Sequence, residues 1–286
     1  MIAKNKLEEL VKKYEVVDFI KNDPIQFSYR FFDVIARQEL SALDKSSTEA
    51  IFTDIEIKNI EIAAFLSSLF AYGNREVFIK KLDELFEIMK NQPLDFVLNF
   101  NLSVLRGFNY RFAKDSDIIE VFRILNKLYS KGGDLKKLFE YGYSLPSPLG
   151  GEGRVRGKIY SMLQAVVDYF YSNAKNEAGA GFYHLIPNPQ NGGAMKRMNL
   201  FLRWMVRKPP VDLGIWDFIS PSELLIPLDV HVARLSRQMG LLHRSSNDAK
   251  AVIELTQNLK KIDKNDPAKF DFAIFGLGID SKDKNT

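Results

Sequence analysis

Two residues in the second half of the chain have side chains that could act together in catalysis. Lys196 follows a turn formed by Gly192 and Gly193, and Asp229 stands where a later helix is expected to begin. A primary amine that is neutral can attack carbon and form a Schiff base. A carboxylate beside it can stabilise the positive charge that develops on the reacting carbon. The pair therefore predicts covalent chemistry, if the fold brings both side chains to one site.

Lys196 is predicted to open a helix with two distinct faces. Pro187, Pro189 and the two glycines exclude a helix before about Ala194. One face of the helix is apolar and the other is polar. The apolar face comprises Met195, Met198, Leu202 and Met205, and the polar face comprises Lys196, Asn199, Arg203 and Arg207. Backbone amides at such a helix start can hold a phosphate, and the same positive end disfavours a charged ammonium. The alternative is a basic face that is merely solvated.

Asp229 is predicted to be the N-cap of a three-turn helix that stops at Gly240. Capping explains an aspartate at this position fully, and it is compatible with a role in stabilising a cationic sugar. His231 could orient a phosphate, although a lone histidine is more often structural. The three histidines show no metal-ligand spacing, so we expect no catalytic metal.

Helical periodicity recurs along almost the whole chain and predicts an all-α protein. A buried central helix is expected over residues 60–70, followed by a helix over 75–90 whose inward residues are Val77, Ile79, Leu82, Leu85 and Phe86. Other helices are expected from Asp23-Pro24 to about Leu40, over 115–130 and 158–171, and from Asp266-Pro267 to Gly276 and Gly278. The Pro- and Gly-rich segment 144–158 predicts an exposed loop or local insertion, and residues 280–286 predict a disordered tail.

Composition narrows the classes of function that remain. The chain has 286 residues, no cysteine and a net charge of +4. The lack of cysteine excludes disulfides, thiolate catalysis and a Cys-ligated iron–sulfur cluster. The N-terminus does not have the pattern of a signal peptide, and no apolar run has the length of a membrane span, so we expect a cytoplasmic protein without a membrane partner.

The segments around Lys196 and Asp229 resemble those of the helix-hairpin-helix DNA glycosylases. Lys196-Arg197-Met198-Asn199-Leu200-Phe201-Leu202 is similar to the family's segment that begins with its Schiff-base lysine. Leu228-Asp229-Val230-His231-Val232-Ala233-Arg234 resembles its Val-Asp-Thr-His-hydrophobic-x-Arg segment, whose aspartate is catalytic. The resemblance implies one bilobal all-α domain over residues 1–286, with the active-site cleft between its lobes and the hairpin, the Lys helix and the Asp helix in 185–240. More closely, most of the chain resembles a bacterial family of uncharacterised proteins within or near that superfamily.

The resemblance also implies a set of site residues and a partner. Lys196 would be the nucleophile and Asp229 the assisting carboxylate of a base-excision glycosylase and abasic-site lyase. The partner would be double-stranded DNA with a damaged base, bound by a monomer without a cofactor. The implied DNA-binding residues are Gly192, Gly193, Arg197, Arg203, His231, Arg234, Asn74 and Arg75, and the implied base-pocket residues are Trp216 and Phe275. For the aromatic residues of the C-terminal run, core packing is the competing interpretation.

Two departures from the family pattern concern the substrate and the way in which the hairpin binds the DNA phosphate. The hairpin segment 186–193 is longer than the family's usual Leu-Pro-Gly-Val-Gly, and Asp229 follows Lys196 by 33 residues, a long interval. A long interval resembles the archaeal 8-oxoguanine branch and favours that substrate. Two alternatives stay open: a non-catalytic helix-hairpin-helix DNA-binding protein, and an all-α interaction protein in which the lysine and the aspartate are incidental.

Overall fold

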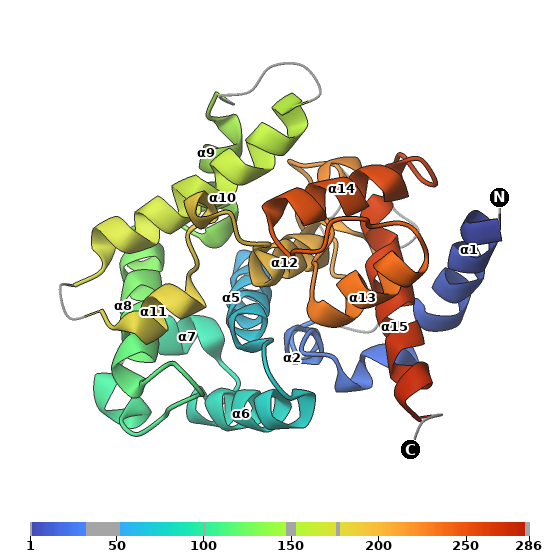
Figure 1. Cartoon of the computed structure of the whole chain (residues 1–286). Coiled ribbons are helices and arrows are strands. Elements are labelled where there is room, and N and C mark those ends of the chain that lie inside the picture. The colour runs from blue at the N-terminus through green and yellow to red at the C-terminus, as the bar shows by residue number, and fades with distance from the viewer. Residues whose placement is uncertain (1, 33–51, 100, 147–152, 176–177, 284–286) are drawn as a thin grey trace. The chain divides into compact units, whose positions relative to one another are not determined.

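The computed structural model of the chain describes residues 2–32, 52–99, 101–146, 153–175 and 178–283, and within them it is helical (Figure 1). The described residues form no strand; they contain two isolated β-bridges, Tyr110 with Ala113 and Gly193 with Asp248. The prediction of an all-α protein is confirmed.

The chain divides into two compact units. The first unit comprises, of the described residues, 2–23 and 191–283, so it contains both Lys196 and Asp229. The second unit comprises the described residues of 24–190. The prediction of one bilobal domain stays a prediction, and each unit is described below by itself.

The second unit is built around helix α5, Asp54–Phe70. Every residue from Ile60 to Phe70 is buried, as its nearly continuous apolar sequence predicts. Thr53 caps the start of the helix in a reciprocal capping box with Glu56. The other elements of this unit are α2 (Gln26–Tyr29), α6 (Arg75–Ile88), α7 (Pro93–Leu98), η3 (Leu102–Leu105), α8 (Asp115–Ser130), α9 (Leu135–Ser144), α10 (Gly153–Asn173) and α11 (Ala180–Leu185).

The first unit joins the two ends of the chain. Helix α1 (Ile2–Tyr14) packs on α15 (Phe270–Asp283), which also packs on α13 (Val230–Gln238). The remaining elements of this unit are η1 (Val17–Asn22), α12 (Lys196–Val206), η5 (Pro221–Glu223), α14 (Ala249–Lys260) and η6 (Pro267–Lys269). The short helix η4 (Pro189–Asn191) spans the boundary between the units, because Asn191 is its last residue and belongs to the first unit.

The last helix corrects the expectation that two glycines end it. Helix α15 continues through Gly276 and Gly278 to Asp283, so residues 280–283 are helical, and 284–286 lie outside the described residues. A Cβ atom at Gly276 would lie less than 3 Å from the ring atoms of Tyr14. Gly276 therefore allows α1 to approach α15 closely and does not stop the helix.

Two further predictions about helices are wrong. Val77 is 53% exposed, because α6 buries the stripe Phe78, Leu82, Leu85 and Phe86. Asp23 ends η1 in an extended conformation, as residues before proline tend to do, and no helix starts at Pro24. Residues 33–40 of that predicted helix lie outside the described residues.

The expected loop 144–158 is shorter than predicted. Helix α10 already begins at Gly153 and packs on α9, where Gly142 lies against the backbone of Met162. Residues 147–152 lie outside the described residues.

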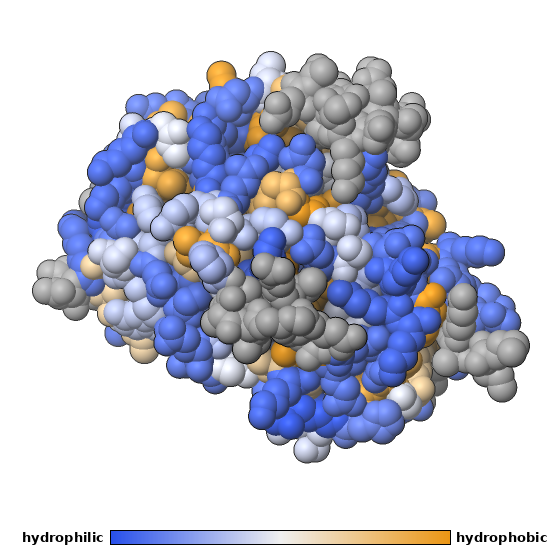
Figure 2. Space-filling view, turned by 90° about the horizontal axis from the view of Figure 1, so that it is seen from above, coloured by the Kyte–Doolittle hydropathy of each residue, from blue (hydrophilic) through white to orange (hydrophobic). Residues whose placement is uncertain are grey.

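The surface is mostly hydrophilic on the face drawn in Figure 2, where hydrophobic side chains form small separate patches. Among the described residues, no helix combines the length and the apolar character that crossing a membrane requires.

Candidate functional site

The first part of the site is the loop that leads into α12. Gly192 adopts a positive φ of 70°, and its carbonyl accepts a hydrogen bond of 2.9 Å from the amide of Ala249. Gly193 forms a β-bridge with Asp248, the N-cap of α14. The loop is thus fixed to the start of α14, and it places Lys196, which is half-buried, in the first turn of α12.

The second part is Asp229, the N-cap of α13. Its Oδ1 atom accepts hydrogen bonds of 2.8 Å from the amides of both His231 and Val232. Within the described residues, Oδ2 accepts no hydrogen bond. The predicted cap is confirmed, and one carboxylate oxygen remains for an electrostatic role.

The third part is Asp271, in the first turn of α15. It is only 5% exposed and forms an ion pair with Nη1 of Arg203. Burial raises the pKa of Asp271 to about 7; Arg203 and Lys196 oppose this rise, and the charge of Asp229 adds to it. Lys196 and Asp229 are therefore both close enough to Asp271 for their charges to act on it.

Three helix starts in one unit thus bring together an amine and two carboxyl groups. In Figure 1, α12 is drawn in gold, α13 in orange and α15 in red. Sequence reasoning missed Asp271, although it is a lone carboxylate inside the apolar run from Phe270 to Phe275. An acid inside such a run is a signal of a buried, partnered charge.

Arg203 and Arg207 do not form the basic surface that their spacing predicted. Arg203 is 1% exposed, and its Nε atom donates to Asp212 at 3.1 Å. Arg207 is also buried; it pairs with Asp266 at 2.9 Å and with Asp212 and Glu15. The expectation that Arg203 contacts DNA is wrong for this conformation, because acidic side chains already surround its guanidinium. The alternative of a solvated helix face is wrong for the same reason.

The remaining predicted residues of the first unit divide by exposure. Gly192, Gly193 and Arg234 are exposed, and His231 and Phe275 are half-buried. Arg197 is largely buried and so offers little surface to a phosphate. Trp216 is 2% exposed and packs edge-on against Phe201 with ring centroids 5.2 Å apart. Trp216 thus packs in the core in this conformation, and its role in a base pocket stays a prediction.

Asn74 and Arg75 lie in the second unit, at the start of α6. The Asn74 side chain accepts a hydrogen bond of 3.3 Å from the amide of Val77 and so caps the helix. Capping accounts for this asparagine, and its role toward DNA stays a prediction.

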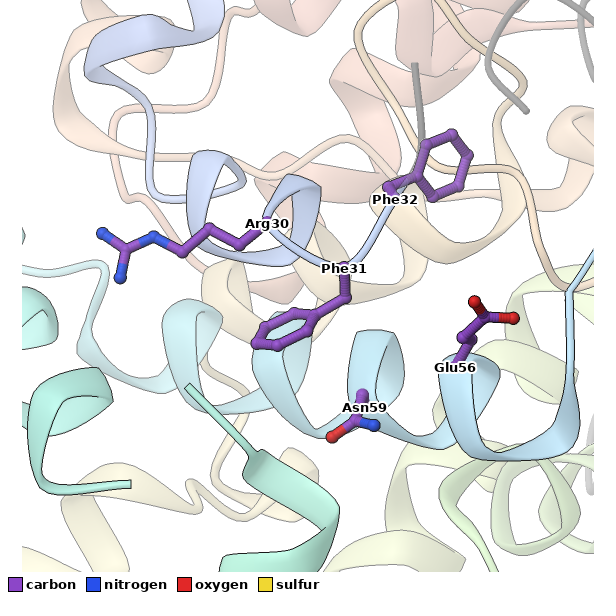
Figure 3. A pocket seen from close by; sticks show the side chains of 5 residues that line it. All are labelled: Arg30, Phe31, Phe32, Glu56 and Asn59. Atoms are coloured by element: carbon purple, nitrogen blue, oxygen red, sulfur yellow. The ribbon is translucent and has the colours of Figure 1, made fainter. Parts of the chain in front are cut away.

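A pocket in the second unit is lined by Arg30, Phe31, Phe32, Glu56 and Asn59 (Figure 3). Its polar side chains already have structural partners. Arg30 pairs with Asp83 at 2.5 Å and also donates to Asn91, while the Asn59 amide bonds the backbone of Leu94 and Ile55. Glu56 completes the capping box of α5. We therefore assign no chemistry to this pocket.

No group of three potential metal ligands occurs among the described residues. The site is thus best characterised by its amine and carboxyl groups.

Comparison with known proteins identifies a family. The chain belongs to the DUF2400 family, because the family model, described as a protein of unknown function, matches residues 50–280. Comparisons with curated proteins and with solved structures find no match.

Proposed function

We propose that this member of the DUF2400 family is a DNA N-glycosylase with abasic-site lyase activity. One observation carries the proposal: within a single unit, the charges of Lys196 and Asp229 both act on the buried carboxyl group of Asp271. A nucleophilic amine and a carboxylate in one neighbourhood suit attack on a sugar carbon. The bilobal helix-hairpin-helix arrangement and 8-oxoguanine as the first substrate to test are parts of the same proposal.

The proposed reaction begins when the amine of Lys196 gives up a proton to solvent and attacks the sugar. Its lone pair forms a bond to C1′ of the nucleotide, while the bond from C1′ to the base breaks and its electron pair leaves with the base, which takes a proton from solvent. Loss of a proton from the new amine and opening of the sugar ring at O4′ give a Schiff base. Removal of a C2′ proton then expels the 3′ phosphate by β-elimination.

Asp229 would stabilise the positive charge that develops on C1′ and O4′ as the base departs. The two backbone amides that hold Oδ1 fix the orientation of the carboxylate before the substrate arrives. A charge that is already oriented stabilises the transition state without reorganisation. Capping and catalysis would thus use the same side chain at the same time.

The burial of two arginines weakens the alternative that the protein binds DNA without catalytic activity. It rested on the cations of α12, and two of these, Arg203 and Arg207, are buried in ion pairs. The reactive pair keeps its basis, because Lys196 and Asp229 are only half-buried.

Borohydride trapping tests the proposal directly. The full chain is incubated with duplexes that carry 8-oxoguanine, uracil or an abasic site, and is then reduced. We expect a covalent protein–DNA adduct that Lys196→Gln abolishes. The matched control is Lys208→Gln, which removes an exposed lysine just beyond the end of α12 and should leave the adduct unchanged.

Two results would count against the proposal. An adduct that persists in Lys196→Gln would move the nucleophile to another residue. No adduct with any of the three duplexes, together with no release of a base, would exclude the glycosylase and leave a binding protein. Base release without an adduct would remove only the lyase step.

A further inference from the structure

A tight turn in the second unit presents an exposed aromatic ring and a guanidinium group together. Tyr110 and Ala113 exchange two backbone hydrogen bonds of 2.9 Å, so Arg111 and Phe112 form the tip of a two-residue turn. Arg111 adopts a positive φ of 51°, which is unfavourable for a residue with a side chain. We call these two residues the Arg111–Phe112 turn.

The surrounding structure holds the turn rigidly in place. The hydroxyl of Tyr72 donates to the carbonyl of Tyr110 at 3.2 Å, and the hydroxyl of Tyr110 donates to the carbonyl of Tyr72. The ring of His184 packs edge-on against both Tyr72, at 4.8 Å, and Phe112, at 5.1 Å. A strained conformation that is fixed by so many contacts is a feature that often accompanies binding sites.

Glycines allow the close packing beneath the turn. A Cβ atom at Gly181 would lie 2.5 Å from the carbonyl oxygen of Phe112, and one at Gly73 would collide with the Arg111 side chain. The turn therefore rests directly on the backbone that precedes α6 and on the first residues of α11.

The turn exposes groups that a folded chain normally covers or pairs. Phe112 is 62% exposed, although burial of a large apolar side chain stabilises a folded protein. The Arg111 guanidinium lies 5.5 Å from the centre of the Phe112 ring and 5.9 Å from that of Tyr72. Within the part of the chain that is described, Arg111 forms no ion pair with a carboxylate.

The segment that contains the turn carries three cations, Arg106, Arg111 and Lys114, and two carboxylates, Asp115 and Asp117, of which Asp117 is buried. Arg106 and Lys114 are exposed, and both act electrostatically on Asp115. The carboxylate of Asp115 is engaged by the amides of Gly107, at 2.8 Å, and Ser116, at 2.7 Å. A flat ring beside cations is the combination that binds unpaired bases and their phosphates.

We propose that the Arg111–Phe112 turn binds single-stranded nucleic acid, with an unpaired base stacked on Phe112 and a neighbouring phosphate held by Arg111. The inference rests on the proposed function only in taking nucleic acid as the partner. It does not depend on the amine of Lys196, because the turn belongs to the other unit.

Fluorescence anisotropy tests the inference with the full chain. The probe is a fluorescein-labelled oligothymidylate of about 12 nucleotides, a length within the site sizes of single-strand-binding folds. We expect Phe112→Ala to raise Kd by roughly 5- to 150-fold, the loss that corresponds to one stacked base, and Phe112→Trp to restore binding. Arg111→Gln should make the plot of log K against log salt concentration less steep, by the amount that corresponds to the loss of about one phosphate contact.

Tyr141→Ala is the matched control, since Tyr141 is also 62% exposed but belongs to helix α9 and not to the Arg111–Phe112 turn. Equal losses in Phe112→Ala and Tyr141→Ala, or no loss in either, would overturn the inference. The two proposals fail in distinguishable ways. Wild-type protein that traps lesion duplexes but does not bind the single strand refutes only the turn. Phe112-dependent binding without trapping refutes only the glycosylase.

Discussion

Replacing Asp271 with asparagine should change how the stability of the protein depends on pH. The substitution keeps the shape of the side chain and leaves an oxygen that can accept from Arg203, but it removes the titration. The pKa of Asp271 is about 7 in the folded chain, mainly through burial, whereas the unperturbed value is 3.8. Between these two values the folded state holds one proton more than the unfolded state, so a rise in pH removes stability.

The magnitude follows from that single proton. The free energy of unfolding of the wild type should fall, relative to that of Asp271→Asn, by about 1.4 kcal/mol for each pH unit. From about pH 5 to about pH 6.5 this gives a relative change of roughly 2 kcal/mol. Burial also raises the pKa values of Glu15 and Asp266. Because both proteins contain these two residues, their titration cancels when the wild type is compared with Asp271→Asn.

Urea unfolding at a series of pH values measures this difference. The matched control is Asp248→Asn, because a side-chain hydrogen bond from Arg244 lowers the pKa of Asp248 to about 2. Asp248 is ionised in both states above pH 5, so its substitution should produce a constant difference. A constant difference for Asp271→Asn as well would mean that Asp271 stays ionised beside Arg203, and the argument from burial would be refuted.

Three further substitutions test other contacts of the first unit. Asp229→Ala should lose about 1 kcal/mol of stability, while Asp229→Asn, which can still cap α13, should lose less; equal losses would show that the cap does not matter. Gly276→Ala forces a Cβ atom against Tyr14 and should cost about 1–3 kcal/mol, whereas Gly193→Ala, with no atom within 4 Å of the added Cβ, should be nearly neutral; a neutral Gly276→Ala would contradict the close approach of α1 and α15. Asp212→Asn weakens the carboxylate shared by Arg203 and Arg207 and should cost about 3–5 kcal/mol, against less than about 1 kcal/mol for Asp54→Asn in the exposed pair with Lys58. Thermal or urea unfolding measures each of these, and similar costs for the two aspartates would show that burial does not strengthen the Asp212 pairs.

Local sequence patterns predicted much of the fold. The bounds of α8 and the buried stretch of α5 followed from apolar periodicity, and the cap at Asp229 followed from the preference of aspartate for helix starts. These features depend on residues within a few positions of each other. That is why they can be read without knowledge of the tertiary structure.

The errors arose where distant residues decide the environment. Arg203 lies on a polar helix face, and periodicity cannot show that Asp212 and Asp271, 9 and 68 residues later, turn that face into a buried ion-pair network. Gly276 resembled a helix stop because its contact with Tyr14 is not local. The Arg111–Phe112 turn was missed because its left-handed residue is held by tertiary contacts and not by a turn motif.

The discontinuity of the first unit has a consequence for synthesis on the ribosome. Tyr14 and Gly276, which pack together, are 262 residues apart, and all described residues of the second unit lie between them in the sequence. At a usual rate of translation, α1 waits on the order of tens of seconds for α15 to be made. The apolar face of α1 is exposed during that interval, and we expect holding chaperones to cover it while the nascent chain grows.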